Sequence, residues 1–121
     1  MTAAAAPSRQ VLTRLMAAAG AATGVVLLTR PLQVVDTIAP AFPIDKLWLV
    51  RALGARLVAQ HGAVLVSASP RLVRLGSAVD LIHAATMVPF LASPRYGPAA
   101  RISGGLAAAY AAVALVVAPR D

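Results

Sequence analysis

Five side chains that could do chemistry lie near the middle of two mostly apolar stretches of the sequence: Arg56, Gln60, His61, Asp80 and His83. Arg56 and Gln60 are four residues apart, and Asp80 and His83 are three apart, so on helices each pair shares a face. A carboxylate such as that of Asp80 accepts hydrogen bonds from a carboxamide or from a guanidinium fork. If the two stretches form an antiparallel helical hairpin, the spacing predicts a polar cluster of Arg56, Gln60, Asp80 and His83.

Two interpretations of this cluster follow from the residue types. In the structural one, Arg56 and Asp80 neutralise each other and fix helix register, and Gln60 and His83 satisfy their hydrogen bonds. In the functional one, the residues line a small polar cavity for a lipid headgroup, an anionic solute or a proton. Ionisable residues inside a membrane cost about 2.5–3.5 kcal/mol each on insertion scales, which makes them functional candidates. His61 lies about 100° further round its helix and is expected to face another helix.

Other chemistries find no support in the sequence. The chain has no cysteine, which excludes disulfides, thiolate metal sites and thiol redox reactions. It has no nucleophile elbow, zinc-protease motif or phosphate-binding loop, and Ser77 lies about 60° from Asp80 and 120° from His83 around a helix, unlike a triad. His61 and His83 differ in depth by about 6 Å, which disfavours a shared haem. We expect no catalytic residue, no metal and no cofactor.

The composition indicates which environment surrounds these residues. Of 121 residues, 60% are hydrophobic and 12% are charged, and glutamate is absent; soluble domains carry about 25% charged residues. The net charge of +7 could suggest nucleic acid, but the arginines stand at the ends of apolar runs and form no basic stripe with aromatics. Anchoring to phosphate headgroups explains them better. We therefore expect a lipid bilayer as the partner, and no nucleic acid.

Four apolar runs predict the elements that position the polar residues, at about 11–29, 47–68, 72–92 and 100–118. Their length suits helices that cross the bilayer, and they lack the strict alternation of membrane strands. The first run could pass for a secretory signal peptide, but three more runs follow it. The sequence predicts one all-α domain over residues 1–121, a bundle of four transmembrane helices.

The connections and flanking residues predict a topology. An even number of crossings places both termini on one side and Phe42, Trp48, Phe90 and Tyr96 on the other, as in an aromatic belt. The link 30–46 has three prolines and two aspartates among apolar residues and is expected to lie along the membrane interface. A slight excess of arginines near the termini favours a multi-pass protein of the cell membrane with cytoplasmic termini.

Small residues predict where the helices pack. Gly20 and Gly24 have GxxxG spacing in the first run, and Gly104, Ala108 and Ala112 form a row in the fourth. Such residues let helix backbones approach closely in lipid. Both patterns fit packing within one chain, and both also fit contacts in a homo-oligomer.

Two resemblances add to this interpretation. In length and helix count the chain resembles small multidrug-resistance transporters, but it lacks the glutamate on which their proton-coupled export depends. The stretches Arg51-Ala-Leu-Gly-Ala-Arg56 and Asp80-Leu-Ile-His83-Ala-Ala resemble uncharacterised small four-helix membrane proteins of actinobacteria, a likeness that implies a membrane bundle and no particular activity.

We expect a non-enzymatic accessory subunit of a larger membrane complex, or a component that binds a small molecule or lipid. The alternative is a small transporter of a solute or lipid that works as a homo-oligomer.

Overall fold

The computed structural model describes residues 8–120, and in this range every regular element is a helix. The long helices are α1 (Arg9–Thr29), α3 (Leu47–Val66), α4 (Pro70–Met87) and α5 (Gly97–Val117). A short helix, α2 (Pro31–Ile38), and single 3-10 turns, η1 (Ile44–Lys46) and η2 (Val88–Phe90), lie in the connections. The expected all-α bundle is confirmed, and the four long helices overlap the four predicted ranges.

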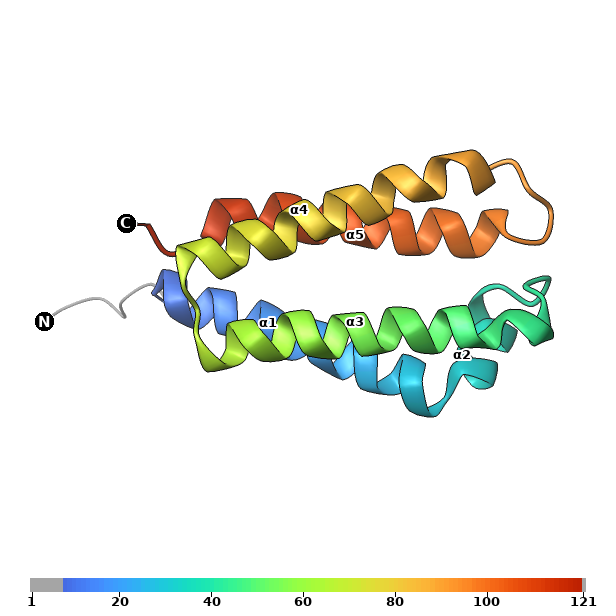
Figure 1. The fold of residues 1–121 in the computed structure, drawn as a ribbon, viewed down its shortest axis with the longest axis horizontal. Helices are drawn as coiled ribbons and strands as arrows, with labels where there is room; N and C mark the ends of the chain where they lie inside the picture. The colour runs from blue at the N-terminus through green and yellow to red at the C-terminus, as the bar shows by residue number, and fades with distance from the viewer. Residues whose placement is uncertain (1–7, 121) are drawn as a thin grey trace, which may run out of the picture.

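The four long helices run side by side along one axis (Figure 1). The start of α1, the end of α5 and the link between α3 and α4 lie at one end of the bundle, called the terminal end below. The helix α2 and the link between α4 and α5 lie at the other, the far end. The polar residues of α3 and α4 lie between these two ends.

Local sequence signals explain where two of the long helices begin. The Ser8 hydroxyl accepts a hydrogen bond from the Val11 amide at 3.1 Å, and the Ser69 hydroxyl accepts one from the Leu72 amide at 3.2 Å. These hydroxyls satisfy amides that have no partner within the first turn of a helix. Proline at the first position of α4, Pro70, suits a helix start because it lacks an amide hydrogen.

Helix α1 packs most closely on α3, at glycines on both helices. A Cβ atom on Gly24 would lie 2.7 Å from the carbonyl oxygen of Gly54, and one on Gly54 would lie 2.7 Å from that of Gly24. A Cβ on Gly20 would overlap the ring of His61. The GxxxG pattern of the first run is therefore used within the chain, where it brings two helix backbones together.

Helix α5 packs on α4 through a different stripe from the predicted row. Its buried residues are Gly97, Ala100, Gly104, Ala107 and Ala111. Gly104 faces Met87, with 3.1 Å between a Cβ built on the glycine and that of Met87. Ala108 and Ala112, which the sequence analysis grouped with Gly104, are exposed. A row at steps of four drifts about 40° per step around a helix, whereas alternating steps of three and four stay on one face.

The link between α1 and α3 is more structured than the sequence analysis expected. Pro31 and Val35 are buried on one face of α2, and Ala39, which caps the end of this helix, is buried as well. Phe42 is also buried, and its ring meets that of Tyr96 edge to face, with 5.5 Å between centroids. Phe42 therefore belongs to an apolar cluster at the far end, whereas Trp48, expected in the same aromatic belt, is 60% exposed.

The outer surface of the bundle is apolar. Large hydrophobic side chains are exposed on all four long helices, including Leu15, Leu65, Ile82 and Val116. Within residues 8–120, three helical segments are long and apolar enough to cross a membrane: Arg9–Thr29, Ile44–Val66 and Gly97–Val117. Helix α4 is not among them, because it also carries Arg71, Arg74 and Asp80.

Candidate functional site

Helices α3 and α4 are joined by a polar network of three side chains. Nη1 of Arg56 donates to Oε1 of Gln60 at 2.7 Å and to Oδ1 of Asp80 at 3.2 Å. Nε2 of Gln60 donates to Oδ2 of Asp80 and to the carbonyl oxygen of Gly76, both at 3.2 Å. Each carboxylate oxygen of Asp80 thus accepts a hydrogen bond from α3. Arg56, Gln60 and Asp80 are called the polar network below.

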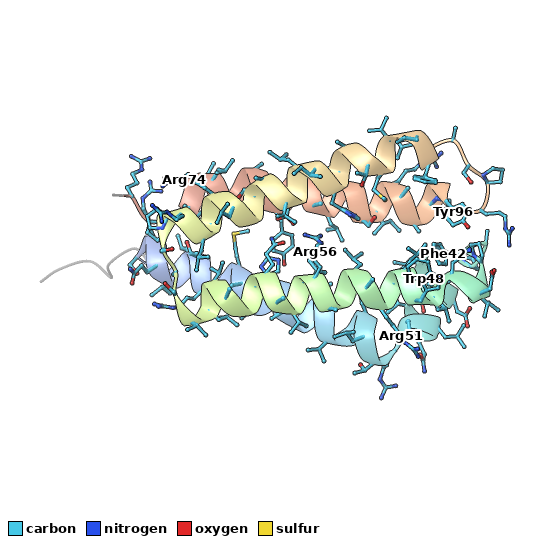
Figure 2. All side chains as sticks on the ribbon, viewed as in Figure 1. Phe42, Trp48, Arg51, Arg56, Arg74 and Tyr96 are labelled. Atoms are coloured by element: carbon cyan, nitrogen blue, oxygen red, sulfur yellow. The ribbon has the colours of Figure 1, made fainter. Side chains whose placement is uncertain are left out.

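The packing of the helices leaves room for these side chains. The backbones of α3 and α4 are less closely packed than those of α1 and α3 or of α4 and α5, and Figure 2 shows Arg56 between α3 and α4. Gly76 lets the Gln60 carboxamide approach α4, since a Cβ there would lie 3.2 Å from Nε2 of Gln60. The long side chains of Arg56 and Gln60 therefore connect two closely packed helix pairs: one pair is α1 and α3, and the other is α4 and α5.

Arg56 uses only one of its three nitrogens in this network. Among the described residues, the Nε atom of Arg56 is buried without a hydrogen-bond partner, and Nη2 makes no hydrogen bond. The Asp80 side chain is 5% exposed and that of Arg56 is 26% exposed. The Nε–Nη2 edge, a geometry that can grip two oxygens of one ligand, therefore makes no hydrogen bond to the described residues.

His83 makes its hydrogen bond outside the polar network. Its Nε2 atom lies 3.2 Å from the Ser103 hydroxyl of α5. His83 was predicted to lie beside Asp80, but residues three apart on a helix still differ by about 60°. Because α4 packs on α5 as well as facing α3, Asp80 points to α3 and His83 pairs with α5.

His61 faces α1 and α5, as the sequence analysis expected from its angle to Gln60. It is 7% exposed. Its ring lies against Gly20 of α1, with 5.3 Å between its centroid and that of Tyr110 on α5.

A cavity of about 30 Å³ lies beside the polar network, between all four long helices. Its polar lining comes from Thr13, Gln60, His61, Ser77, Asp80 and Tyr110. Sequence reasoning missed Ser77 and Tyr110 as members of one site. The sequence did contain a signal for Ser77, because it lies only about 60° from Asp80 around α4. Tyr110 could be assigned to the site only by knowing how α5 packs.

No group of three or more histidine or carboxylate side chains within residues 8–120 could hold a metal ion. Comparison with known protein families, with curated proteins and with solved structures gives no match. The resemblance to actinobacterial membrane proteins therefore stays a prediction.

Proposed function

We propose that this chain is a non-enzymatic integral membrane protein whose polypeptide crosses the bilayer four times, through α1, α3, α4 and α5. Three features support a crossing by α4. Arg71 and Arg74 lie near its start at the terminal end, where long side chains can reach the headgroups. The charge of Asp80 is paired with Arg56. The outer face of α4 exposes Leu75, Leu81 and Ile82 to the surroundings.

The orientation of the bundle in the cell membrane stays a prediction. Figure 2 shows Arg51 toward the far end. Apart from Arg56, the basic residues then divide evenly, since five lie near each end of the bundle. The terminal end has Arg9, Arg14, Arg71, Arg74 and Arg120, and the far end has Arg30, Lys46, Arg51, Arg95 and Arg101. This even division leaves the positive-inside rule without a preference.

The function that the site supports best is binding of a small molecule or lipid that carries acceptor oxygens, at the Nε–Nη2 edge of Arg56. The observation that carries this proposal is the buried Nε of Arg56, which lacks a partner among the described residues. A buried donor without a partner is costly, and an arginine edge matches a carboxylate or phosphate. Because Asp80 already neutralises Arg56, a neutral headgroup oxygen also fits.

Native mass spectrometry of the chain released from detergent micelles tests this proposal. We expect wild type to carry a bound lipid or small acid, identified by its mass, that Arg56→Lys loses. The lysine keeps the charge beside Asp80 but removes the planar edge. Arg51→Lys is the matched control, because Arg51 is exposed on the same helix; it should bind as wild type does. Equal occupancy in Arg56→Lys and wild type would overturn the proposal.

The same spectra address the assembly state. The glycines Gly20, Gly24 and Gly104 pack within the chain, so we expect the mass of one 12.3 kDa chain with its ligand. A dimer or larger homo-oligomer would instead favour the transporter, and a stoichiometric larger partner would identify an accessory subunit.

A further inference from the structure

The cavity beside the polar network contains an unsatisfied polar group of its own. Ser77 is 3% exposed, and its hydroxyl has no hydrogen-bond partner among the residues that the structure describes. Ser77 lines the cavity together with Asp80, His61 and Tyr110. A buried hydroxyl without a partner is costly unless something in the adjacent space accepts or donates a hydrogen bond.

The size of the cavity limits what can satisfy Ser77. A water molecule needs about 10–15 Å³ of such space and two to four polar partners, and the cavity measures about 30 Å³. It therefore has room for about two water molecules and none for a lipid headgroup. The hydroxyls of Ser77 and Tyr110, the imidazole of His61 and the carboxylate of Asp80 provide the partners.

The charge of the cavity also selects a neutral ligand. Asp80 carries the negative charge among the polar lining residues, and Arg56 pairs with it at 3.2 Å. Because Arg56 already balances the one negative charge that Asp80 presents to the cavity, neither a monovalent cation nor an anion would find an unpaired opposite charge there.

We propose that this cavity is a hydration site, in which one or two water molecules connect the Ser77 hydroxyl to the lining groups of α3, α4 and α5. The site lies on the terminal side of the polar network, because its lining continues from Asp80 to Thr13 near the start of α1 and to Val117 at the end of α5. It is separate from the Arg56 edge, since Arg56 does not line it. In this proposal, bound water lies at the centre of the bundle on the terminal side of the polar network.

Radiolytic hydroxyl labelling of the full chain in lipid nanodiscs, read residue by residue by mass spectrometry, tests this proposal. Radiolysis of a bound water labels the reactive side chains beside it, and His61 and Tyr110 are reactive residues that line the cavity. We expect both to be labelled in wild type. In Ser77→Val, which fills the cavity with an apolar side chain, labelling of both should fall to background.

Gly62→Val is the control for added volume, because a Cβ atom built on Gly62 meets no atom within 4 Å; it should label as wild type does. Circular dichroism confirms that each variant is folded, and Ser77→Ala, which removes the hydroxyl without adding volume, should lower the labelling if Ser77→Val does not fold. Unlabelled His61 and Tyr110 in wild type, or labelling unchanged by every folded Ser77 variant, would overturn the hydration site. Neither result would affect ligand binding at Arg56, which the mass spectra test.

Discussion

At the scale of single residues, the informative pair is Arg56 and Asp80. The two side chains come from different helices and lie 3.2 Å apart, and the carboxylate is almost completely buried. A buried ion pair often contributes little net stability compared with apolar residues of similar size. Removing one partner is much more harmful, because it leaves the other charge buried and unpaired.

We therefore expect Asp80→Leu to lower the free energy of unfolding by about 3–5 kcal/mol, and Arg56→Met/Asp80→Leu to be more stable than Asp80→Leu alone. Titration with a denaturing detergent, followed by circular dichroism, measures both. Arg51→Met is the control, since Arg51 is exposed, and should change stability by less than about 0.5 kcal/mol. If the losses from Arg56→Met and Asp80→Leu simply added, the two residues would not be coupled.

The contact among Arg56, Gln60 and Asp80 could be predicted from the sequence, because spacing of four aligns the first two and the turn at Pro70 fixes their depth relative to Asp80. The partner of His83 could not. Its hydrogen bond to Ser103 depends on which neighbour α4 packs against, and periodicity within one helix does not contain that information. The cavity at Ser77 requires four helices at once, so it lies beyond any local pattern.

At the scale of elements, the close approach of α1 and α3 depends on two glycines. Gly24 and Gly54 lie against each other's carbonyl oxygens, and no flexible side chain is available there to move aside. The small residues of the first run predicted tight packing, but the partner on α3 was not predicted. Helix α2 was also missed, although Pro31 and Val35 have helical spacing; the link was expected only to lie along the membrane interface.

Gly24→Ala should destabilise the chain by about 1–3 kcal/mol, because overpacking forces two helix backbones apart. The new Cβ would lie 2.7 Å from the Gly54 carbonyl oxygen and 2.9 Å from Val58. Gly62→Ala is the matched control on α3, with no atom within 4 Å of the added carbon, and should not reduce stability. The same detergent titration measures both; equal stability of the two variants would argue against the α1–α3 contact.

At the scale of the whole molecule, the apolar outer surface and the three helices that are apolar enough to cross a membrane fit a membrane protein. A protein that folds in water buries its large hydrophobic side chains, whereas the buried hydrophobic residues of this bundle are mostly alanine and valine. Large hydrophobic side chains face outward instead. The sequence predicted this arrangement from composition, and three apolar helices agree with it, while the crossing by α4 awaits a direct test.

A single-cysteine test is simple in this chain because it has no native cysteine. Ser67→Cys in the link before α4 and Ala92→Cys after η2 are both exposed positions. If α4 crosses the bilayer, a membrane-impermeant maleimide added outside sealed vesicles should label one of them and not the other. Labelling of both after the vesicles are opened is the control. Equal labelling of both in sealed vesicles would mean that α4 does not cross.

At the terminal end, Arg9 and Thr13 connect the start of α1 to the end of α5. Nη1 of Arg9 donates to the carbonyl oxygen of Val116 at 2.6 Å, a contact that spans 107 positions of the sequence, and the Thr13 hydroxyl donates to the Val117 carbonyl at 3.3 Å. During biosynthesis these bonds cannot form until the residues of α5 have been made. The start of α1 therefore gains its partners on α5 only after the 107 positions that separate Arg9 from Val116 have been translated.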